Sequence, residues 1–255
     1  MIQAHRTARS LAIGAAVVIV SLAAPSVSHA GPLAGWWPMN EGRGQTVYDW
    51  SGNGNHGTLG STPAVDANDP TWTHGLFGSG RALSFDGDDV VTIPRSNALE
   101  PSRLTVSSWV RAASSPGRYK YVVAKGGQAC EAASYGLYTG PNGGIAFYIF
   151  DGTEYYLSPE APPSIWNDAW HNAAGTFDGS KVRLYVDGRE VGSGTAVPAG
   201  TAIAYPLANG TGGFGDYVNR ECGLMLTGDI DTVRIWNAAL PVDRYWVFLR
   251  ALFSR

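Results

Sequence analysis

Short runs in which hydrophobic and polar residues alternate are the main pattern along the chain. The run LTVSSWVRA places Leu104, Val106 and Val110 on one face of an extended strand. Successive side chains of a strand point to opposite faces, so this spacing predicts a strand with one face in a core. Helical spacing is almost absent, apart from a short turn at 96–100 and a segment that begins at Pro241, a residue suited to a first helical position.

Two further runs strengthen the prediction of strands. The run IAFYIF places Ile145, Phe147 and Ile149 on one face and Tyr148 on the other. The run KVRLYVDGREV alternates and then turns at the Asp-Gly pair 187–188, which supplies the positive φ angles of a type I′ hairpin. The other strand candidates are residues 34–40, 45–50, 82–94, 119–126, 134–140, 153–158, 170–177 and 228–236. This spacing of short strands predicts an all-β fold, a two-sheet antiparallel β-sandwich or jelly roll.

The first 30 residues have the features of a secretory signal peptide. Two arginines precede an apolar stretch at 11–24, and small side chains precede a cleavage site after Ala30. An uncleaved anchor is the alternative, although the apolar stretch is short for a membrane span. We therefore expect an extracellular protein without a later membrane span, in which residues 31–255 form a single domain with a short C-terminal helix.

Charge argues against nucleic acid as a partner. The formal net charge of the whole chain is −3, and removal of the two arginines of the signal peptide changes it to −5. The sequence has no run of basic residues and no zinc-type spacing of cysteine and histidine. A nucleic-acid-binding protein would be expected to have a basic patch or stripe.

The two cysteines, Cys130 and Cys222, are best interpreted as one disulfide because the chain is predicted to be exported. Two buried free thiols are the alternative. A bond between them would close a loop of about ninety residues, for which chain entropy gives an upper figure of about 4–5 kcal/mol.

Five segments occur in an order and spacing that are typical of one protein family. They are GWWPMNEGRGQTVYDWSGNGNHGTL, ALSFDGDDVVTIP, LTVSSWVRA, WHNAAGTFDGSKVRLYVDGREV and GDIDTVRIWNAAL. Together they cover nearly all of residues 34–240, and this region resembles laminin-G-like jelly-roll domains of the concanavalin A-like lectin/glucanase superfamily. The resemblance implies two packed antiparallel sheets, one of them concave, a structural calcium ion in many members, and glycan or protein binding as the usual role.

The resemblance also bears on the cysteines and on the C-terminal tail. It implies that Cys130 and Cys222 form a bridge seen in bacterial relatives. The tail YWVFLRALF departs from the family pattern because it is strongly apolar. Packing on its own domain and contact with another domain or subunit are both open for this tail.

The stretch DWSGNGNHGT, which begins at Asp49, predicts part of a calcium site. Its oxygen-bearing residues match the first half of an EF-hand loop, but Gly60 stands where a bidentate glutamate is needed. We therefore predict a site of another kind, with Asp49, Asn53 and Asn55 as ligands and Asp231 supplying the missing charge. The resemblance implies calcium ligands at the same two aspartates.

The prediction for Asp231 rests on strand alternation. Asp231 is expected to share a face with Val233 and Ile235, and an unpaired carboxylate facing the core would be costly without a cation. The alternative is that the asparagines and glycines serve a tight turn, while Asp231 pairs with Arg234 or caps a backbone group.

Two other groups of residues are weaker metal candidates. The acidic residues Asp86, Asp88 and Asp89 lie in a predicted hairpin, where aspartate is common, so we favour a turn. His56 has no partner of metal-ligating type nearby in the sequence, and we interpret it as a surface histidine.

Catalytic signatures are absent from the sequence. None of its seven glutamates begins the E-x-D-x-x-E motif that aims the carboxylates of glucanases into one cleft, and no G-x-S-x-G motif occurs. We expect a non-catalytic protein, with a glycoside hydrolase as the less favoured alternative.

Glycan binding is the favoured role. Tyr148 lies opposite the core face of its strand and Tyr155 follows in the next strand, so both are candidates for stacking on sugar rings. The alternative is that they are ordinary tyrosines of exposed strands. The expected partner is a glycan, or else an extracellular protein that binds a structural or adhesion module.

Overall fold

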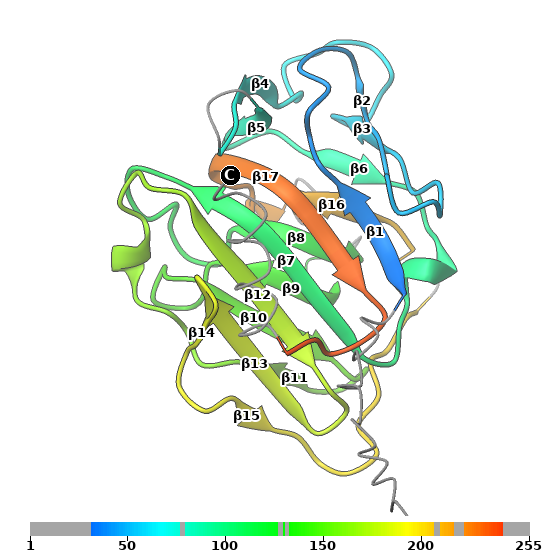
Figure 1. The fold of residues 1–255 in the computed structure, drawn as a ribbon, viewed down its shortest axis with the longest axis vertical. Helices are drawn as coiled ribbons and strands as arrows, with labels where there is room; N and C mark the ends of the chain where they lie inside the picture. Colours follow the sequence, from blue (N-terminus) through cyan, green and yellow to red (C-terminus); the bar gives the residue numbers. More distant parts are fainter. Residues whose placement is uncertain are drawn as a thin grey trace, which may run out of the picture.

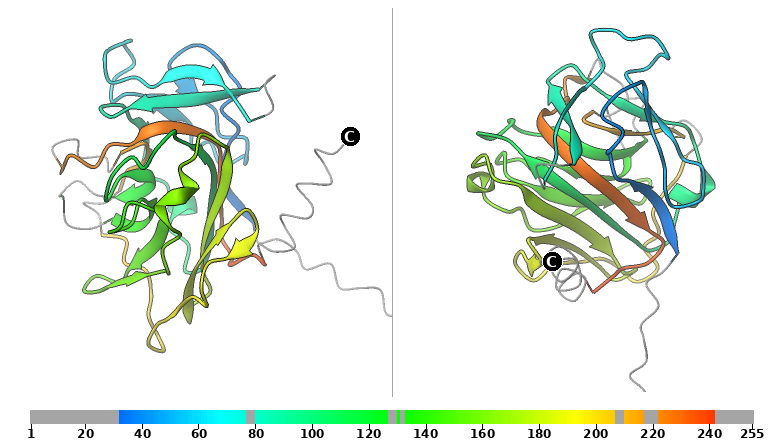
Figure 2. Two further views of the ribbon diagram at one scale, coloured as in Figure 1. Left: turned by 90° about the vertical axis from the view of Figure 1, so that its left-hand side faces the viewer. Right: turned by 45° about the horizontal axis from the view of Figure 1, so that its top comes forward.

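The computed structural model describes residues 32–76, 80–126, 130, 133–206, 210–216 and 222–241. This part of the chain forms two antiparallel sheets that pack face to face, with two short 3-10 helices (Figures 1 and 2). The β-sandwich predicted from the alternating runs is confirmed. The predicted signal peptide and the predicted C-terminal helix lie outside the described residues.

The first sheet has nine strands. Along its main path it contains, in order, β14 (Arg189–Glu190), β13 (Lys181–Val186), β12 (His171–Phe177), β7 (Leu104–Arg111), β17 (Thr227–Trp236), β5 (Arg81–Asp86) and β4 (Thr71–His74). Two strands lie off this path: β1 (Leu33–Trp37) pairs with β17, and β15 (Thr195–Ala196) pairs with β13.

The second sheet has eight strands. In spatial order they are β11 (Tyr155–Leu157), β10 (Ala146–Phe150), β9 (Ala133–Tyr138), β8 (Tyr121–Gly126), β16 (Gly212–Phe214), β6 (Val91–Ile93), β3 (Gly57–Leu59) and β2 (Thr46–Val47). The 3-10 helices are η1 (Asn97–Leu99) and η2 (Pro163–Ile165). The first of these confirms the short turn that was predicted near residues 96–100.

Strand β17 has a central place although it is the last described strand in the sequence. It pairs with β7 on one side and with β5 and β1 on the other (Figure 1). The nine-stranded sheet is therefore continuous only when this late segment is in place.

The core lies between the two sheets and follows the alternation of the sequence. Leu104, Val106 and Val110 are at most 1% exposed. The sheets approach closely where Phe147 of β10 packs on Gly175 of β12, because a methyl group on Gly175 would lie only 2.0 Å from the Phe147 ring. The glycine is needed there for side-chain packing between sheets.

One expected strand is two strands in the structure. Residues 82–94 were predicted as a single region with a hairpin, but β5 belongs to the nine-stranded sheet and β6 to the eight-stranded sheet. The acidic turn at 86–89 is therefore a corner between sheets, and the hairpin prediction is wrong. The type I′ hairpin at 187–188 is confirmed, with φ values of 50° and 76°.

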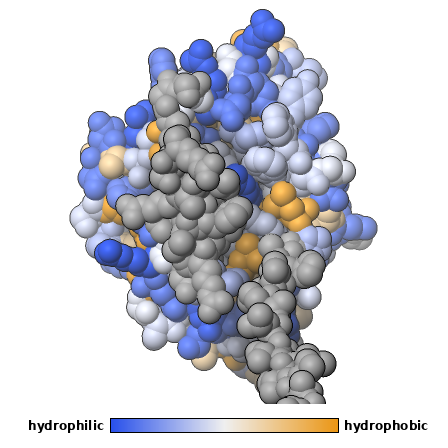
Figure 3. All heavy atoms as spheres, viewed as in Figure 1, coloured by the Kyte–Doolittle hydropathy of each residue, from blue (hydrophilic) through white to orange (hydrophobic). Residues whose placement is uncertain are grey.

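The described residues include no helix with the length and apolar character that membrane crossing requires. The face of the molecule seen in Figure 3 is mostly hydrophilic and carries a few separate apolar patches.

Candidate functional site

A hollow lined mainly by tyrosines lies on the outer face of the eight-stranded sheet. We call it the tyrosine cleft, and its volume is about 380 Å³. Its lining residues are Tyr119, Tyr121, Cys130, Tyr138, Tyr148, Tyr155, Leu157 and Leu224. None of these side chains carries a charge, so the cleft offers a ligand aromatic faces, apolar carbon and hydroxyl groups.

The tyrosines reach this face because of strand alternation. In β10, Phe147 and Ile149 point into the core, so Tyr148 between them points outward. In the register of β8 and β9, Tyr138 lies opposite Tyr121. Their ring centroids are 5.5 Å apart, so rings from neighbouring strands meet above the sheet.

A glycine between the rings makes room for them. Gly136 of β9 lies opposite Tyr148 on one side and Ala124 on the other. A methyl group on Gly136 would lie 2.7 Å from the Tyr121 ring and 2.8 Å from the Tyr148 ring. Any side chain at this position would displace the floor of the cleft.

Tyr148 lies at the centre of the ring packing. Its ring meets those of Tyr138, Tyr155 and Tyr121 edge to face, with centroids 5.1, 5.6 and 6.3 Å away. The hydroxyl groups of Tyr148 and Tyr121 form a hydrogen bond of 2.9 Å. Edge-to-face pairs contribute about 0.5–1.5 kcal/mol each beyond area burial, so the floor is well fixed.

The rim of the cleft is exposed, whereas its floor is buried. Tyr119 and Tyr155 are each 42% exposed and Leu157 is 36% exposed. The three other tyrosines are at most 7% exposed. A bound ligand would therefore make its largest contacts with the two rim tyrosines.

Tyr119 is held at the rim in an unusual backbone conformation. Its φ of 60° lies in the left-handed region, which is uncommon for a bulky residue. Its N–H donates to the Thr139 carbonyl at 2.9 Å, and its ring lies nearly parallel to that of Tyr138. Strain of this kind persists where surrounding contacts fix a residue, often at binding sites.

The hydroxyl groups of the floor are hydrogen-bonding groups and not charges. Burial raises the pKa of Tyr138, and the nearby carboxylate of Glu160 raises it further. The hydroxyl therefore stays protonated at neutral pH and keeps its ability to donate. Neutral hydroxyls and aromatic faces together suit a sugar, which presents hydroxyl groups and apolar C–H faces.

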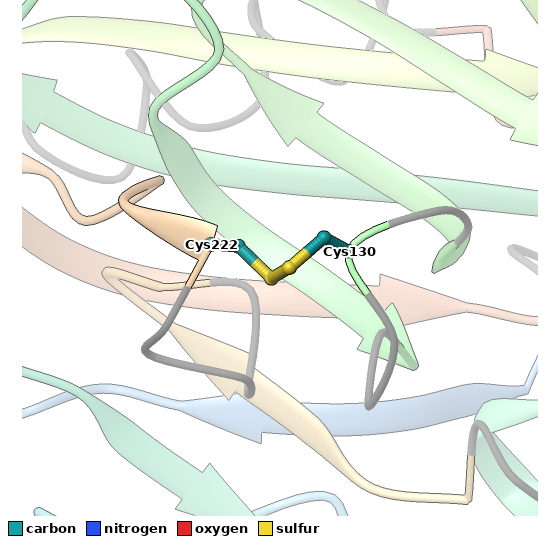
Figure 4. The surroundings of a disulfide bond; sticks show 2 residues. All are labelled: Cys130 and Cys222. Carbon is teal, nitrogen blue, oxygen red and sulfur yellow. A yellow bond between two sulfur atoms is a disulfide. The ribbon is translucent and has the colours of Figure 1, made fainter.

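The predicted disulfide is present and borders the cleft. Cys130 and Cys222 are bonded across 92 residues of sequence, as Figure 4 shows. Cys130 lines the cleft, and after Cys222 the carbonyl of Leu224 accepts a hydrogen bond of 3.0 Å from the N–H of Tyr121. The Lys120 ammonium group donates to the Gly223 carbonyl at 2.7 Å. The bridge thus holds one wall of the cleft against β8.

The structure brings together both tyrosines that the sequence marked as candidates. Tyr148 forms part of the floor and Tyr155 part of the rim. The sequence interpretation missed Tyr119, Tyr121 and Tyr138. A usable signal existed for Tyr138, because Leu137 before it faces the core and the next side chain of a strand faces outward. Alternation could not locate Tyr119, because its φ of 60° breaks the extended chain before β8.

A second hollow, of about 610 Å³, is more polar. Asp86, Arg111, Asp168 and Asp229 are among its lining residues. Arg111 donates to Asp229 at 2.6 Å, and its guanidinium group lies 5.0 Å above the ring of Trp170. Its arginine already has partners within the fold, so we place the candidate site at the tyrosine cleft.

The loop that begins at Asp49 is held by hydrogen bonds. One carboxylate oxygen accepts from the N–H groups of Trp36 and Ser51 at 3.0 and 2.8 Å. The other oxygen accepts from the Ser51 hydroxyl and the Asn55 N–H at 2.9 and 2.8 Å. A carboxylate has about four acceptor sites, and protein donors occupy that number here.

The other polar residues of the loop tie it to β1. The side-chain amides of Asn53 and Asn55 both donate to the Ala34 carbonyl, at 3.1 and 2.9 Å. The Asp49 N–H donates to Nδ1 of His56 at 2.9 Å, so the exposed His56 takes part in the same network. We call this arrangement the stapled loop.

Asp231 does not share the contacts of the stapled loop. A bulge between Asp231 and Arg234, with Thr232 at a φ of 49°, shifts the alternation of β17. Ile230 and Val233 both point into the core, so Asp231 does not share a face with Val233, and that part of the prediction is wrong.

The Asp231 carboxylate caps a backbone group, which was the alternative. It accepts from the Leu76 N–H at 3.0 Å and from the Thr232 hydroxyl at 2.8 Å. Burial raises the pKa of Asp231. The contacts of Asp49, Asn53, Asn55 and Asp231 thus do not form one open ligand set that fits calcium, and calcium at these residues stays a prediction.

Among the described residues, three acidic side chains gather within 4.8 Å of one another at Asp86, Asp88 and Asp89. The N–H of Asp86 donates to Asp89 at 2.8 Å and that of Asp88 to Asp86 at 3.2 Å. Burial is the main cause that raises the pKa of Asp89 to about 6. These bonds belong to the corner between β5 and β6, in line with the interpretation as a turn.

Comparison with known proteins agrees with the fold and the family resemblance. The family described as the concanavalin A-like lectin/glucanases superfamily matches residues 85–244. No curated protein sequence is significantly similar to the chain.

Several solved structures share the fold at low sequence identity. One is domain 4 of AbnA, an extracellular arabinanase of Geobacillus stearothermophilus, which was solved in complex with arabinotriose. It is 19% identical in sequence, with a TM-score of 0.53, and the match covers 84% of this chain and 97% of that chain. The binding domain of Paraclostridial Mosquitocidal Protein 1 is 14% identical with a TM-score of 0.62, over 84% of this chain and 52% of that one.

A third similar structure is a toxin domain with a protein partner. The binding domain of botulinum neurotoxin DC, in complex with rat synaptotagmin II, is 13% identical with a TM-score of 0.58, over 86% of this chain and 52% of that one. The chain thus spans about half the length of both toxin domains. These similarities show the fold alone.

Proposed function

The chain belongs to the concanavalin A-like lectin/glucanases superfamily, and we propose that it is a secreted, non-catalytic module that binds carbohydrate in the tyrosine cleft. The observation that carries the proposal is the lining of this cleft. It combines five tyrosines with no charged side chain, on a floor that is fixed by packing.

The lining favours a neutral sugar. A charged glycan would require a cationic or metal partner to offset the loss of its hydration, and the lining offers neither. Tyrosine faces stack on apolar C–H surfaces, while tyrosine hydroxyls exchange hydrogen bonds with sugar hydroxyls. Binding should therefore depend weakly on salt.

A binding role is favoured over hydrolysis by the same lining. A retaining glycosidase needs two carboxyl groups about 5–5.5 Å apart beside the scissile bond. The cleft has no carboxylate among its lining residues. Glu160, which lies near enough to act on Tyr138, accepts hydrogen bonds from the backbone of Asn142 and Gly144 and is used in holding that turn.

Secretion is part of the proposal. It is supported by the features of residues 1–30 and by the disulfide, because such bonds persist in oxidising compartments. Calcium is not assigned a role at the cleft, and its predicted role in stability is tested separately below.

The test is affinity electrophoresis of residues 31–255 through gels that contain arabinan, xylan, mixed-linkage β-glucan or galactomannan. Arabinan is included first because the arabinanase domain of similar fold was solved with arabinotriose. We expect retardation by at least one neutral polymer, and about fivefold weaker binding after Tyr155→Ala, since a stacked ring contributes on the order of 1 kcal/mol.

Tyr185→Ala is the matched control. Tyr185 is a partly buried tyrosine of β13 in the nine-stranded sheet, away from the cleft lining. Its loss should leave retardation unchanged while the melting temperature reports folding. Equal retardation of the wild type and the Tyr155 variant would refute the cleft as the site. Failure of every polymer to retard the wild type would favour a protein ligand.

A further inference from the structure

Two large aromatic side chains stand exposed directly after β2. Tyr48 is 50% exposed and Trp50 is 61% exposed, whereas Val47 and Asp49 are buried. This alternation shows that the segment is extended, with Tyr48 and Trp50 on the same side. Two residues of extended chain span roughly 7 Å, so one oligosaccharide can touch both rings.

The backbone beneath these rings is fixed. Tyr48 and Trp50 flank Asp49, whose four hydrogen bonds form the centre of the stapled loop. The Trp50 N–H donates to the Trp36 carbonyl at 2.7 Å, and the Tyr48 N–H donates to Glu41 at 3.0 Å. The rings are therefore held in place before any ligand arrives, which lowers the entropy cost of binding.

Each exposed ring is also backed by another ring. Trp50 meets Trp36 with ring centroids 5.8 Å apart and planes at 66°. Tyr48 meets His56 at 5.3 Å and 74°. The Arg234 guanidinium lies over the Trp36 ring, 5.1 Å from its centre. These contacts limit rotation of the exposed side chains.

We propose that Tyr48 and Trp50 form a second carbohydrate-binding site, the tryptophan shelf, which stacks on sugar rings of a neutral polysaccharide. Trp50 exposes most of its surface, which is unusual for tryptophan, and a network of polar bonds holds it there. An indole face of this kind binds the apolar C–H face of a sugar. A sugar partner needs no deep pocket, and the shelf is a pair of exposed rings on a fixed segment.

The two sites lie toward opposite edges of the eight-stranded sheet. Tyr148 is in β10 and the shelf follows β2, with six strand spacings between them. At about 4.8 Å per spacing this is roughly 30 Å. Trp50 packs on Trp36, which alternates with the core residue Trp37 and so lies on the outer side of the nine-stranded sheet, whereas the cleft is on the outer side of the eight-stranded sheet. The two sites therefore face different sides of the sandwich, and each binds a polymer through its own rings.

Four proteins test the proposal in pull-down assays with insoluble arabinan, xylan, mannan and cellulose: the wild type, Trp50→Ala, Tyr155→Ala and the double variant. Trp50→Phe keeps a ring at the site, and Val65→Ala removes another exposed apolar side chain, one that is 82% exposed. Both serve as controls. The shelf is exposed, so melting temperatures of the variants should match the wild type.

We expect Trp50→Ala to weaken binding to a polymer about tenfold, Trp50→Phe by less, and Val65→Ala not at all. The double variant should bind more weakly than either single variant. Equal polymer binding by wild type and Trp50→Ala overturns the shelf, whatever Tyr155→Ala does. Loss through Trp50 but not through Tyr155 supports the shelf and refutes the cleft. Failure of the wild type to bind any of the four polymers overturns both.

Discussion

The tyrosine cleft and the tryptophan shelf both present aromatic rings, but they are held in different ways. In the cleft, each ring leans on other rings over a sheet whose small residues leave space for them. On the shelf, the rings stand on an extended segment outside the two sheets, which is fixed by one buried carboxylate and its donors. Apolar packing fixes the first region, and hydrogen bonding fixes the second.

This difference predicts different weaknesses. The packed rings of the cleft are disturbed when the volume of a neighbouring side chain changes, because close-packed rings leave no space for an extra methyl group. A hydrogen-bonded loop fails when one acceptor that serves several donors is removed, because each buried donor then loses its partner. Changes that harm one region should therefore leave the other intact.

Removal of the disulfide should have the largest effect. In Cys130→Ser/Cys222→Ser the free energy of unfolding should fall by about 4 kcal/mol, because the bond closes a loop of 92 residues. The folded variant should also bind the cleft ligand more weakly than the wild type, since Cys130 lines the cleft. Denaturant unfolding measures the first effect, and affinity electrophoresis with the polymer that retards the wild type measures the second.

The shelf is the internal reference for this variant. Polymer binding that depends on Trp50 should survive at temperatures where the variant is folded. If the shelf and the cleft weaken to the same degree, the bridge stabilises the whole fold and has no particular role at the cleft wall.

Asp49→Ala should have the second largest effect on stability. The free energy of unfolding should fall by about 3 kcal/mol or more, because four donors lose a charged acceptor. Binding by the shelf should be lost while the cleft keeps its affinity. Asp49→Asn is the matched variant, since it keeps the shape and part of the acceptor capacity and should lie between the wild type and the alanine variant.

The same variants decide the calcium prediction. If hydrogen bonds alone hold the stapled loop, the melting temperature of Asp49→Ala falls by the same amount in calcium and in EGTA. A wild-type midpoint that rises with calcium, and loses this response in Asp49→Ala and Asp231→Ala, would establish the metal site instead. Metal analysis of the purified protein completes the comparison.

Gly136→Ala should have the smallest effect on stability, about 2 kcal/mol, because its methyl group would overlap two tyrosine rings. Its effect should be local, with weaker binding of whichever neutral glycan the cleft binds and unchanged binding through the shelf. Gly212→Ala is the control, since a methyl group there finds its nearest neighbour at an ordinary 3.4 Å. If Gly136→Ala binds as tightly as the wild type, the floor does not need the present ring positions.

Much of the fold could be predicted from alternation alone. Leu104, Val106 and Val110 are buried as their spacing required, and Asp187 begins the turn that its Asp-Gly pair indicates. Alternation also predicted that Tyr148 lies outside the core, and Tyr148 is one of the residues that line the cleft. Local sequence carries this information because the side-chain period of a strand is two.

The missed features depend on contacts between distant segments. Residues 86–90 cross from one sheet to the other, and no local pattern distinguishes this corner from a hairpin. The bulge at Thr232 reverses the side to which Asp231 points, so an argument from spacing chose the wrong face. Asp49 and Asn55 were predicted to act together, but no local pattern showed that the Trp36 N–H of β1 donates to the Asp49 carboxylate.

The position of β17 has a consequence for how the protein is made. Residues 33–37 pair with residues 227–236, and β5 pairs with β4 on one side but finds its other neighbour only in residues 227–236. These pairings therefore wait until almost the whole chain has been synthesised. Until then β5 and β1 leave open edges that other chains can bind. Such distant pairing makes folding slow. The nine-stranded sheet is therefore completed late, when β17 joins β1, β5 and β7.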